Sequence, residues 1–140
     1  MKIQRVYLTT ERGMEFLASA KLIDKECIPG CRWYPVDFLW VVLDNGEVVG
    51  YAGLVENHPS KNCGYICRVG IIPSHGGYGM QKRLTRVICK FARKLGWNEI
   101  VSDTWRNPPS ANSFIACGFK TYQPPNPWAF ADSIYWRKVL

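Results

Sequence analysis

The chain has 140 residues and a mass of 16.0 kDa. Hydrophobic residues make up 47% of it and aromatic residues 14%, which is enough apolar surface for a packed core and excludes a disordered or coiled-coil chain. The 18 Lys and Arg side chains outnumber the 11 Asp and Glu side chains, and the formal net charge of +7 is compatible with nucleic acid, with a phosphorylated cofactor or with solubility alone.

The length is typical of one domain, so we expect a single domain over residues 1–140. No segment approaches the ~18 consecutive apolar residues of a membrane span, and the N-terminus does not resemble a secretory signal. We therefore expect a cytoplasmic protein without membrane contact. The sequence does not choose between a monomer and a homodimer.

Six cysteines are many for this length, and the pairs Cys27/Cys31 and Cys63/Cys67 have a spacing that structural zinc sites use. Cys63 and Cys67 lie on a predicted strand, however, where a rise of ~3.3 Å per residue separates their Cα atoms by roughly 13 Å. We therefore expect no metal site and six reduced thiols that pack as small apolar residues.

In chain order, the first predicted elements are a strand and a helix. Residues 2–8 alternate between polar and apolar, which is typical of a strand. Thr9 or Thr10 is a suitable N-cap for a helix that ends at about Cys27. Two prolines and a glycine make residues 28–35 a loop.

The strongest local signal is a hairpin. Residues 38–43 and 48–55 are apolar runs on either side of Asp44-Asn-Gly-Glu47, and an Asn-Gly pair is typical of a tight turn between strands. After a polar loop, a further strand is predicted over residues 65–72.

The second half of the chain predicts two more helices and three more strands. Apolar residues recur along one face of a helix over residues 80–95, and a short helix follows over residues 110–116. The strands are predicted over residues 98–104, 119–122 and 133–139. This order indicates the α/β (α+β) class, with a mixed central β-sheet flanked by helices.

The segment Pro73-Ser-His-Gly-Gly-Tyr-Gly79 joins a predicted strand to a predicted helix. Glycines let backbone N–H groups converge, and the N-terminus of a helix carries a partial positive charge, so this junction suits a phosphate or pyrophosphate. It is neither a Walker loop nor the glycine pattern of dinucleotide-binding folds. Taken alone, the segment is interpreted equally well as a plain turn.

Three motifs of the second half agree in spacing with those of a known family. They are the strand end Ile71-Ile-Pro73, the glycines Gly77 and Gly79, and the run Asn107-Pro-Pro-Ser110-Ala-Asn-Ser-Phe114-Ile-Ala-Cys-Gly118-Phe119. The segment from about Tyr65 to Phe119 thereby resembles the GNAT superfamily of N-acetyltransferases. The first sixty residues agree with it in element order only. The resemblance implies a GNAT-like acyl-CoA N-acyltransferase fold.

The sequence departs from the family pattern at three positions. Gly76 stands where Arg or Gln is usual, and Gln81 replaces a small residue. Binding of a phosphate by backbone amides tolerates both changes because it needs no side chain. Phe114 replaces a Tyr that often protonates the leaving thiolate. A thiol of pKa ~8.5 is a fairly good leaving group, so Tyr65, Tyr122 or water can substitute for that acid.

The resemblance implies that acetyl-coenzyme A (acetyl-CoA) is the acyl donor and lies between two neighbouring parallel strands, where a backbone N–H polarises its carbonyl group. The pyrophosphate would meet the glycine loop and the pantetheine the preceding strand. The implied contacts are Gly70, Ile71, Ile72, His75, Gly76, Gly77, Tyr78, Gly79, Met80, Gln81, Lys82, Asn107, Ser110 and Phe114.

The implied reaction is direct attack by a primary amine, of a small molecule or a protein, in a ternary complex with acetyl-CoA. An amine of pKa ~10 must first lose a proton, so a carboxylate or His is expected nearby. Glu56 and Asp103, each near the end of a predicted strand, are the candidate catalytic residues, with His75 and His58 behind them. The alternative is that both carboxylates are solvated charges.

Residues 80–95 carry six basic side chains and no acidic one. We interpret Lys90 to Lys94 as the solvated face of a helix, while Lys82 or Arg83 could attract the phosphates of the cofactor. A track for a nucleic-acid backbone is the remaining interpretation. The aromatic residues of the C-terminal segment are either core or the lining of an acceptor pocket; they are Trp128, Phe130, Tyr135 and Trp136.

Two other functions remain open at this point. The first is a GNAT-fold enzyme that modifies a nucleobase or a nucleic acid, favoured by the net charge and the aromatic residues. The second is a non-catalytic module that binds CoA or nucleic acid, favoured by Phe114 and Gly76.

Overall fold

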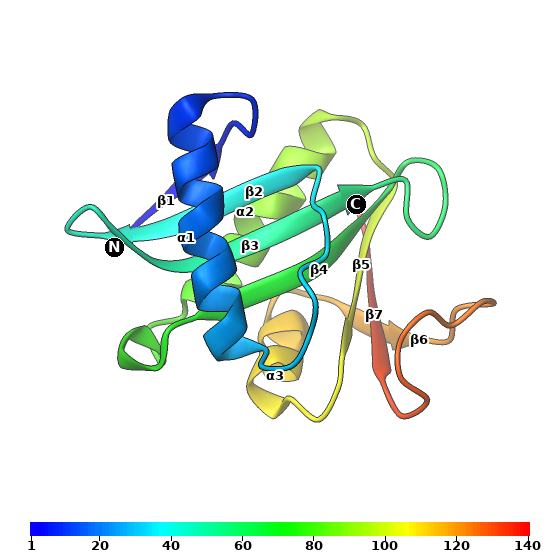
Figure 1. Ribbon diagram of the computed structural model, residues 1–140. Coiled ribbons are helices and arrows are strands. Elements are labelled where there is room, and N and C mark those ends of the chain that lie inside the picture. Colours follow the sequence, from blue (N-terminus) through cyan, green and yellow to red (C-terminus); the bar gives the residue numbers. More distant parts are fainter.

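The computed structural model describes residues 1–140, which form a seven-stranded sheet with helices on both faces (Figure 1). The strands lie in the order β1-β2-β3-β4-β5-β7-β6, and only β4 and β5 pair in parallel. The strands are β1 (Lys2–Val6), β2 (Phe38–Asp44), β3 (Glu47–Glu56), β4 (Cys63–Ile71), β5 (Glu99–Thr104), β6 (Lys120–Tyr122) and β7 (Ile134–Val139). The helices are α1 (Glu11–Cys27), α2 (Met80–Lys94) and α3 (Pro108–Ala116), and a 3-10 turn covers Pro73–His75.

The mixed sheet and the order of elements predicted from the sequence are confirmed, with small shifts in the bounds. β4 contains both Cys63 and Cys67, as expected from the sequence, and it begins at Cys63 because Cys63 and Gly64 already pair with β5. α3 begins at Pro108 because the side chain of Asn107 caps it, and proline is well tolerated in the first turn of a helix.

The two faces of the sheet have separate cores. α1 covers one face, where Phe16, Ala20 and Ile23 pack against residues of β2 and β3. α2 and α3 cover the opposite face, where Leu84, Ile88 and Phe114 belong to a larger cluster that includes Trp40, Leu54, Ile66, Ile100 and Trp136. Figure 1 shows α1 in front of the sheet and α2 behind it. The strands therefore separate two environments in which different chemistry can take place.

A buried polar cluster fixes the end of α1 to the sheet. Asp24 is 2% exposed and accepts a hydrogen bond from the Tyr51 hydroxyl group of β3. The guanidinium group of Arg68 lies 3.8 Å from the Asp24 carboxylate and donates to the backbone carbonyl of Arg32. The loop that follows α1 is thereby held beside β4.

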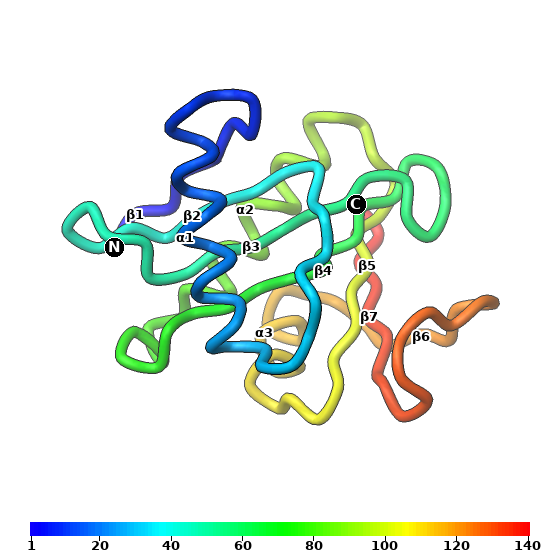
Figure 2. The backbone as a smooth tube through the Cα atoms, viewed as in Figure 1, coloured from blue at the N-terminus to red at the C-terminus, as the bar shows by residue number.

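The parallel strands β4 and β5 pair over only part of their length. Cys63 to Ile66 pair with Glu99 to Ser102, and beyond these residues the two strands separate. The tube in Figure 2 follows this separation from the end where the strands meet. Backbone groups along the remainder of β4 therefore have no neighbouring strand on that side.

No helix of the structure has the length and apolar character that crossing a membrane requires.

Candidate functional site

The glycine loop ends in two left-handed residues. Gly77 and Gly79 have φ angles of +83° and +72°, which L side chains rarely adopt, and Gly79 is the N-cap of α2. Just before them, the 3-10 turn uses its own amides: His75 N–H donates to the Ile72 carbonyl at 2.9 Å, and Gly76 N–H donates to the Pro73 carbonyl at 3.2 Å.

The next six backbone N–H groups, those of residues 77–82, donate no hydrogen bond within the chain. The first helical bond of α2 runs from Arg83 N–H to the Gly79 carbonyl at 3.1 Å. Unpaired amides at the positive end of a helix are suited to a phosphate or pyrophosphate group.

The structure gives His75 and Gly76, both predicted to contact the pyrophosphate, other partners for their backbone N–H groups. Their N–H groups are already bonded in the 3-10 turn, so they are not free donors to an anion. The His75 ring turns away to Asp44, with Nε2 2.8 Å from the carboxylate. Lys82 and Gln81 keep the predicted position at the start of the helix. Met80 offers only its backbone, since its side chain is buried in the core.

Alternation along β4 decides which backbone groups face the gap. Ile72 N–H donates to the Val49 carbonyl of β3 at 2.9 Å, so the backbone groups of Gly70 also point towards β3. Those of Ile71 and Val69 point the other way, into the gap. Of the three predicted residues of this strand end, only Ile71 turns its backbone groups to the gap, while Gly70 and Ile72 turn theirs to β3; Val69, which was not among the predicted residues, also faces the gap.

Gly70 has a packing role instead. A Cβ atom at this position would lie 2.8 Å from the Tyr51 ring and 3.0 Å from the Cys27 sulfur, so no larger residue fits without a shift. The glycine lets the end of α1 approach β4 closely.

The other wall of the gap is formed by α3. Asn107 Oδ1 accepts a hydrogen bond from Ser110 N–H at 3.2 Å, and Gln81 Nε2 donates to Ser110 Oγ at 2.6 Å, which joins α2 to α3. Phe114 is 1% exposed and packs against Phe119 and Trp136. The replacement of a small residue by Gln81 therefore adds a tie between the two helices.

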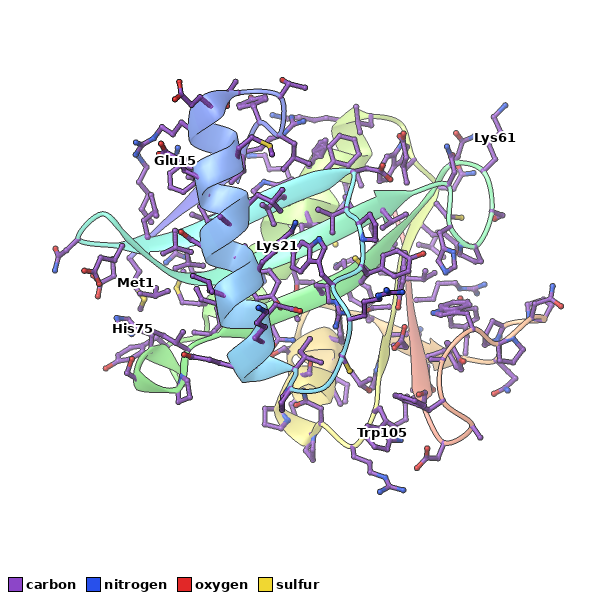
Figure 3. The ribbon with its side chains drawn as sticks, viewed as in Figure 1. Met1, Glu15, Lys21, Lys61, His75 and Trp105 are labelled. Atoms are coloured by element: carbon purple, nitrogen blue, oxygen red, sulfur yellow. The ribbon has the colours of Figure 1, made fainter.

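A cavity of about 850 Å³ opens where β4 and β5 separate. Its volume is within the range of small-molecule sites. It is lined by the end of α1 and the loop after it, by both strands, by α3 and by residues 128–130. The predicted residues Asp103, Asn107, Ser110 and Phe114 all line it. In Figure 3, His75 marks the side of the glycine loop and Trp105 the side of the cavity.

Asp103 lies among aromatic side chains on the α1 face of the cavity. Its Oδ2 atom accepts hydrogen bonds from the Tyr65 hydroxyl at 2.5 Å and from Trp128 Nε1 at 3.0 Å. The His58 ring lies 4.6 Å from the Tyr65 ring and 4.8 Å from the Trp128 ring, centroid to centroid. Burial and the neighbouring Asp103 raise the pKa of Tyr65, so its hydroxyl stays protonated as a donor.

The His58 ring is a second proton acceptor in this cavity. Burial lowers its pKa below the ordinary value of 6.5, against a smaller opposing effect of the Asp103 charge. Its Nε2 atom is buried and has no hydrogen-bond partner in the chain. The imidazole is therefore neutral at neutral pH.

Glu56 and Tyr122 lie away from this centre. Glu56 is exposed at the end of β3 and does not line the cavity, and its N–H donates to the Asp37 carboxylate at 2.9 Å. Tyr122, on β6, does not line the cavity either, and its buried hydroxyl has no partner. Of the two predicted carboxylates, the structure brings only Asp103 to the gap.

The predicted aromatic residues divide between cavity and core. Trp128 and Phe130 line the cavity, and Trp105 packs against Phe130 with ring centroids 4.7 Å apart. Tyr135 contacts Trp128 and accepts a hydrogen bond from Ala129 N–H at 2.8 Å. Trp136 is in the core of the opposite face, where its indole donates to Thr104 at 2.9 Å.

Two of the three cysteine thiols that line the cavity, those of Cys27 and Cys67, are poor nucleophiles. Burial raises the pKa of Cys67 to about 12 and also raises the pKa of Cys27, so both thiols are neutral at neutral pH. No group of three or more His, Cys, Asp or Glu side chains is placed to hold a metal ion.

Comparison with known proteins agrees with this geometry. The Tetrahymena GCN5 structure superposes with a TM-score of 0.80 at 13% identity, covering 99% of this chain and 96% of that one. A Bacillus subtilis acetyltransferase in complex with CoA superposes with a TM-score of 0.73 at 15% identity, covering 99% and 98%. These likenesses show the fold.

Comparison at the level of sequence gives a consistent result. The chain is 28% identical over 104 residues to mouse N-acetyltransferase 8B. The match covers 71% of this chain and 43% of the mouse protein, so the chain spans less than half the length of that relative. The model of the acetyltransferase (GNAT) family matches residues 7–119. The chain therefore belongs to the GNAT family of acetyltransferases.

Proposed function

We propose that the protein transfers an acetyl group from acetyl-CoA to a primary amine by direct attack in a ternary complex. The observation that carries the proposal is one continuous path. Free N–H groups of residues 77–82 begin it, the exposed backbone edge of β4 continues it, and the cavity around Asp103 ends it. The complex of the Bacillus subtilis relative with CoA supports the choice of donor.

The residues along this path fit the parts of acetyl-CoA. Residues 77–82 would hold the pyrophosphate, and the edge groups of Ile71 and Val69 would pair with the amides of the pantetheine arm. Acetyl-CoA supplies an activated thioester. We assign to the Val69 N–H the role of stabilising the negative charge that develops on the carbonyl oxygen. Ser110 and Phe114 would flank the arm from α3.

Asp103 is the general base that we propose. The protonated amine first gives one proton to the Asp103 carboxylate, directly or through a water molecule, and its nitrogen then forms the new bond to the acetyl carbon. The second N–H proton leaves to water as the amide forms. Tyr65 and Trp128 hold one carboxylate oxygen and leave the other without a partner in the chain. The neutral His58 ring is the next proton acceptor in the same cavity.

The C–S bond breaks in the same transfer, and the CoA thiolate then takes up a proton. Phe114 has no proton to give. The Tyr65 hydroxyl already donates to Asp103, and Tyr122 lies outside the cavity. Water entering the cavity is therefore the proton source that we propose, which is adequate for a leaving group of pKa ~8.5.

Thermal unfolding with acetyl-CoA tests the donor site. The ligand would bind only the folded chain, so acetyl-CoA at 100 times its Kd should stabilise the protein by about 2.7 kcal/mol. ADP-ribose at the same concentration is the control and should give a smaller stabilisation. An unchanged melting temperature at saturating acetyl-CoA would overturn the proposal.

The same protein is then assayed for release of CoA thiol with a panel of primary amines. Amine-dependent release supports the enzyme. Stabilisation without release, for every amine on the panel, would leave the non-catalytic CoA-binding module as the function. A cytoplasmic location, a single domain over residues 1–140 and a monomeric or dimeric state remain predictions.

A further inference from the structure

The basic side chains of the chain are unevenly distributed. β1 and α2 carry eight of the 18 Lys and Arg residues, two on β1 and six on α2, and none of the 11 Asp and Glu residues. α1, on the other face of the sheet, carries Glu11, Glu15, Asp24 and Glu26. In Figure 3, Glu15 lies on the α1 side, in front of the sheet, while α2 lies behind it.

The six cations of α2 form one continuous face. At 100° per residue they fall within an arc of about 120°, opposite the buried residues Leu84, Ile88 and Ala92. Arg83, Arg86, Lys90, Arg93 and Lys94 are all exposed. None of the six forms an ion pair, although four salt bridges occur elsewhere in the chain. A solvated helix face usually mixes both signs of charge, and this face does not.

A groove continues this face onto β1. Lys2 and Arg5 of β1 lie on one side, Arg83 and Arg86 of α2 on the other, and Trp40 also lines the groove, which has a volume of about 730 Å³. It contains no acidic residue. We use the name basic face for this groove together with the exposed cations of α2.

Aromatic rings, not carboxylates, hold Arg5 in place. Its guanidinium carbon lies 4.6 Å from the centroid of the Phe91 ring, 4.9 Å from that of Tyr7 and 5.4 Å from that of Phe38. Its Nε atom is buried without a partner. The positive charge at the groove is therefore oriented by packing and is not neutralised by the chain, as expected for an anion-binding arginine.

We propose that the basic face binds the phosphate backbone of a single-stranded nucleic acid. Arg86, Lys90 and Lys94 follow one another at four-residue spacing, about 6 Å along the helix axis, which is comparable to the distance between neighbouring phosphates of an extended single strand. Tyr7, which is 60% exposed beside Arg5, gives a base a stacking surface next to the groove. An acidic peptide would use the charges but not this ring.

The basic face is distinct from the proposed acetyl-transfer site. The aromatic side of the cavity lies on the α1 face of the sheet, and the gap for the pantetheine lies between β4 and β5. The basic face lies on the α2 face and at β1, at the other edge of the sheet. The inference thus concerns docking and does not depend on the proposed function.

The test is fluorescence anisotropy with a labelled 12-nucleotide single strand at about 50 mM salt. The variant Arg86→Gln/Lys90→Gln/Arg93→Gln should bind at least about tenfold more weakly than the unaltered chain. The slope of log affinity against log salt should become shallower by ~0.7 for each phosphate that the variant no longer neutralises. The matched control is Lys25→Gln/Lys61→Gln/Lys120→Gln, which removes three exposed positive charges elsewhere and should bind nearly as tightly as the unaltered chain.

Both variants reduce the net charge from +7 to +4 at exposed positions, so a fold defect would appear as a lowered melting temperature in either. Equal weakening in the two variants would mean that only net charge matters, and it would overturn the proposal. Displacement of the strand by saturating acetyl-CoA would place the strand at the glycine loop and overturn it as well. So would equal competition by polyglutamate, which would indicate an acidic protein partner.

Discussion

Asp103 acquires its environment from residues that are distant in the chain. Tyr65 lies 38 positions before it and Trp128 lies 25 positions after it, yet both donate to the same carboxylate oxygen. Glu56 has the same kind of position at the end of a strand but remains exposed. Sequence alone treats these two carboxylates alike, since it does not show which strand ends border the gap.

Replacing Asp103 by Asn tests its role as the base. Asp103→Asn keeps the shape of the side chain but removes the charge that accepts the proton of the amine, so we expect kcat/KM to fall by ~10²–10⁴-fold. The control is Glu47→Gln, which removes an exposed carboxylate at the β2–β3 turn and should leave the rate unchanged. Steady-state kinetics with an identified amine is the measurement. If Glu56→Gln lowers kcat/KM and Asp103→Asn does not, the assignment of the base is wrong.

A shift of one residue in the register of β4 would change which of its backbone groups face the gap. The motif that ends in Ile71-Ile-Pro73 locates the strand that leads to the glycine loop, and in the structure β4 ends at Ile71. Which of Gly70, Ile71 and Ile72 face the gap depends on pairing with β3, because neighbouring residues of a strand point in opposite directions. A bulge between Gly53 and Leu54 also changes this register. For these reasons the sequence could predict the strand but not Val69.

Among the elements, α1 and α2 were predicted accurately, and α2 shows where such a prediction stops. Its apolar face gives a strong helical period, and its observed bounds, Met80–Lys94, differ from the predicted ones by one residue. The same pattern cannot show that residues 77–82 keep their N–H groups free, because that depends on the 3-10 turn before the helix.

The substitution Gly77→Ala tests the glycine loop as an element. A Cβ at φ +83° costs about 1–2 kcal/mol of folding stability, and a shift towards negative φ would reorient the free N–H groups. We expect Kd for acetyl-CoA to rise severalfold. Gly46→Ala is the matched control, since Gly46 has φ +81° in the β2–β3 turn, open space around it and no place at the site.

Isothermal titration gives Kd for both variants, and urea unfolding gives their stability. Comparable loss of stability with weaker acetyl-CoA binding only in Gly77→Ala is the expected pattern. Unchanged Kd in Gly77→Ala would argue against the loop as the pyrophosphate site.

At the scale of the whole molecule, the cluster of Asp24, Tyr51 and Arg68 joins α1, β3 and β4. It also holds the loop after α1, which lines the cavity, through the carbonyl of Arg32. The helical period of α1 did not predict a buried Asp24. A charged residue on the inner face of a helix is explained only by partners that tertiary structure brings to it.

Arg68→Met tests this cluster. It leaves the Asp24 charge buried without its cation, so urea unfolding should show a loss of about 3 kcal/mol. Because the loop is released, KM for the amine should rise, while Kd for acetyl-CoA should change little. Lys25→Met, at an exposed position of α1, should leave all three quantities unchanged. A stable Arg68→Met protein would show that the cluster contributes little to holding the fold together.

The short ladder between β4 and β5 has a mechanical consequence. Four residue pairs are the whole of the strand pairing that joins β1–β4 to β5–β7 within the sheet. A ligand arm that bonds to the free edge of β4 would act as an inserted strand and brace the two halves against each other. The central sheet would then be most rigid in the complex, because the bound ligand would take the place of a strand between β4 and β5.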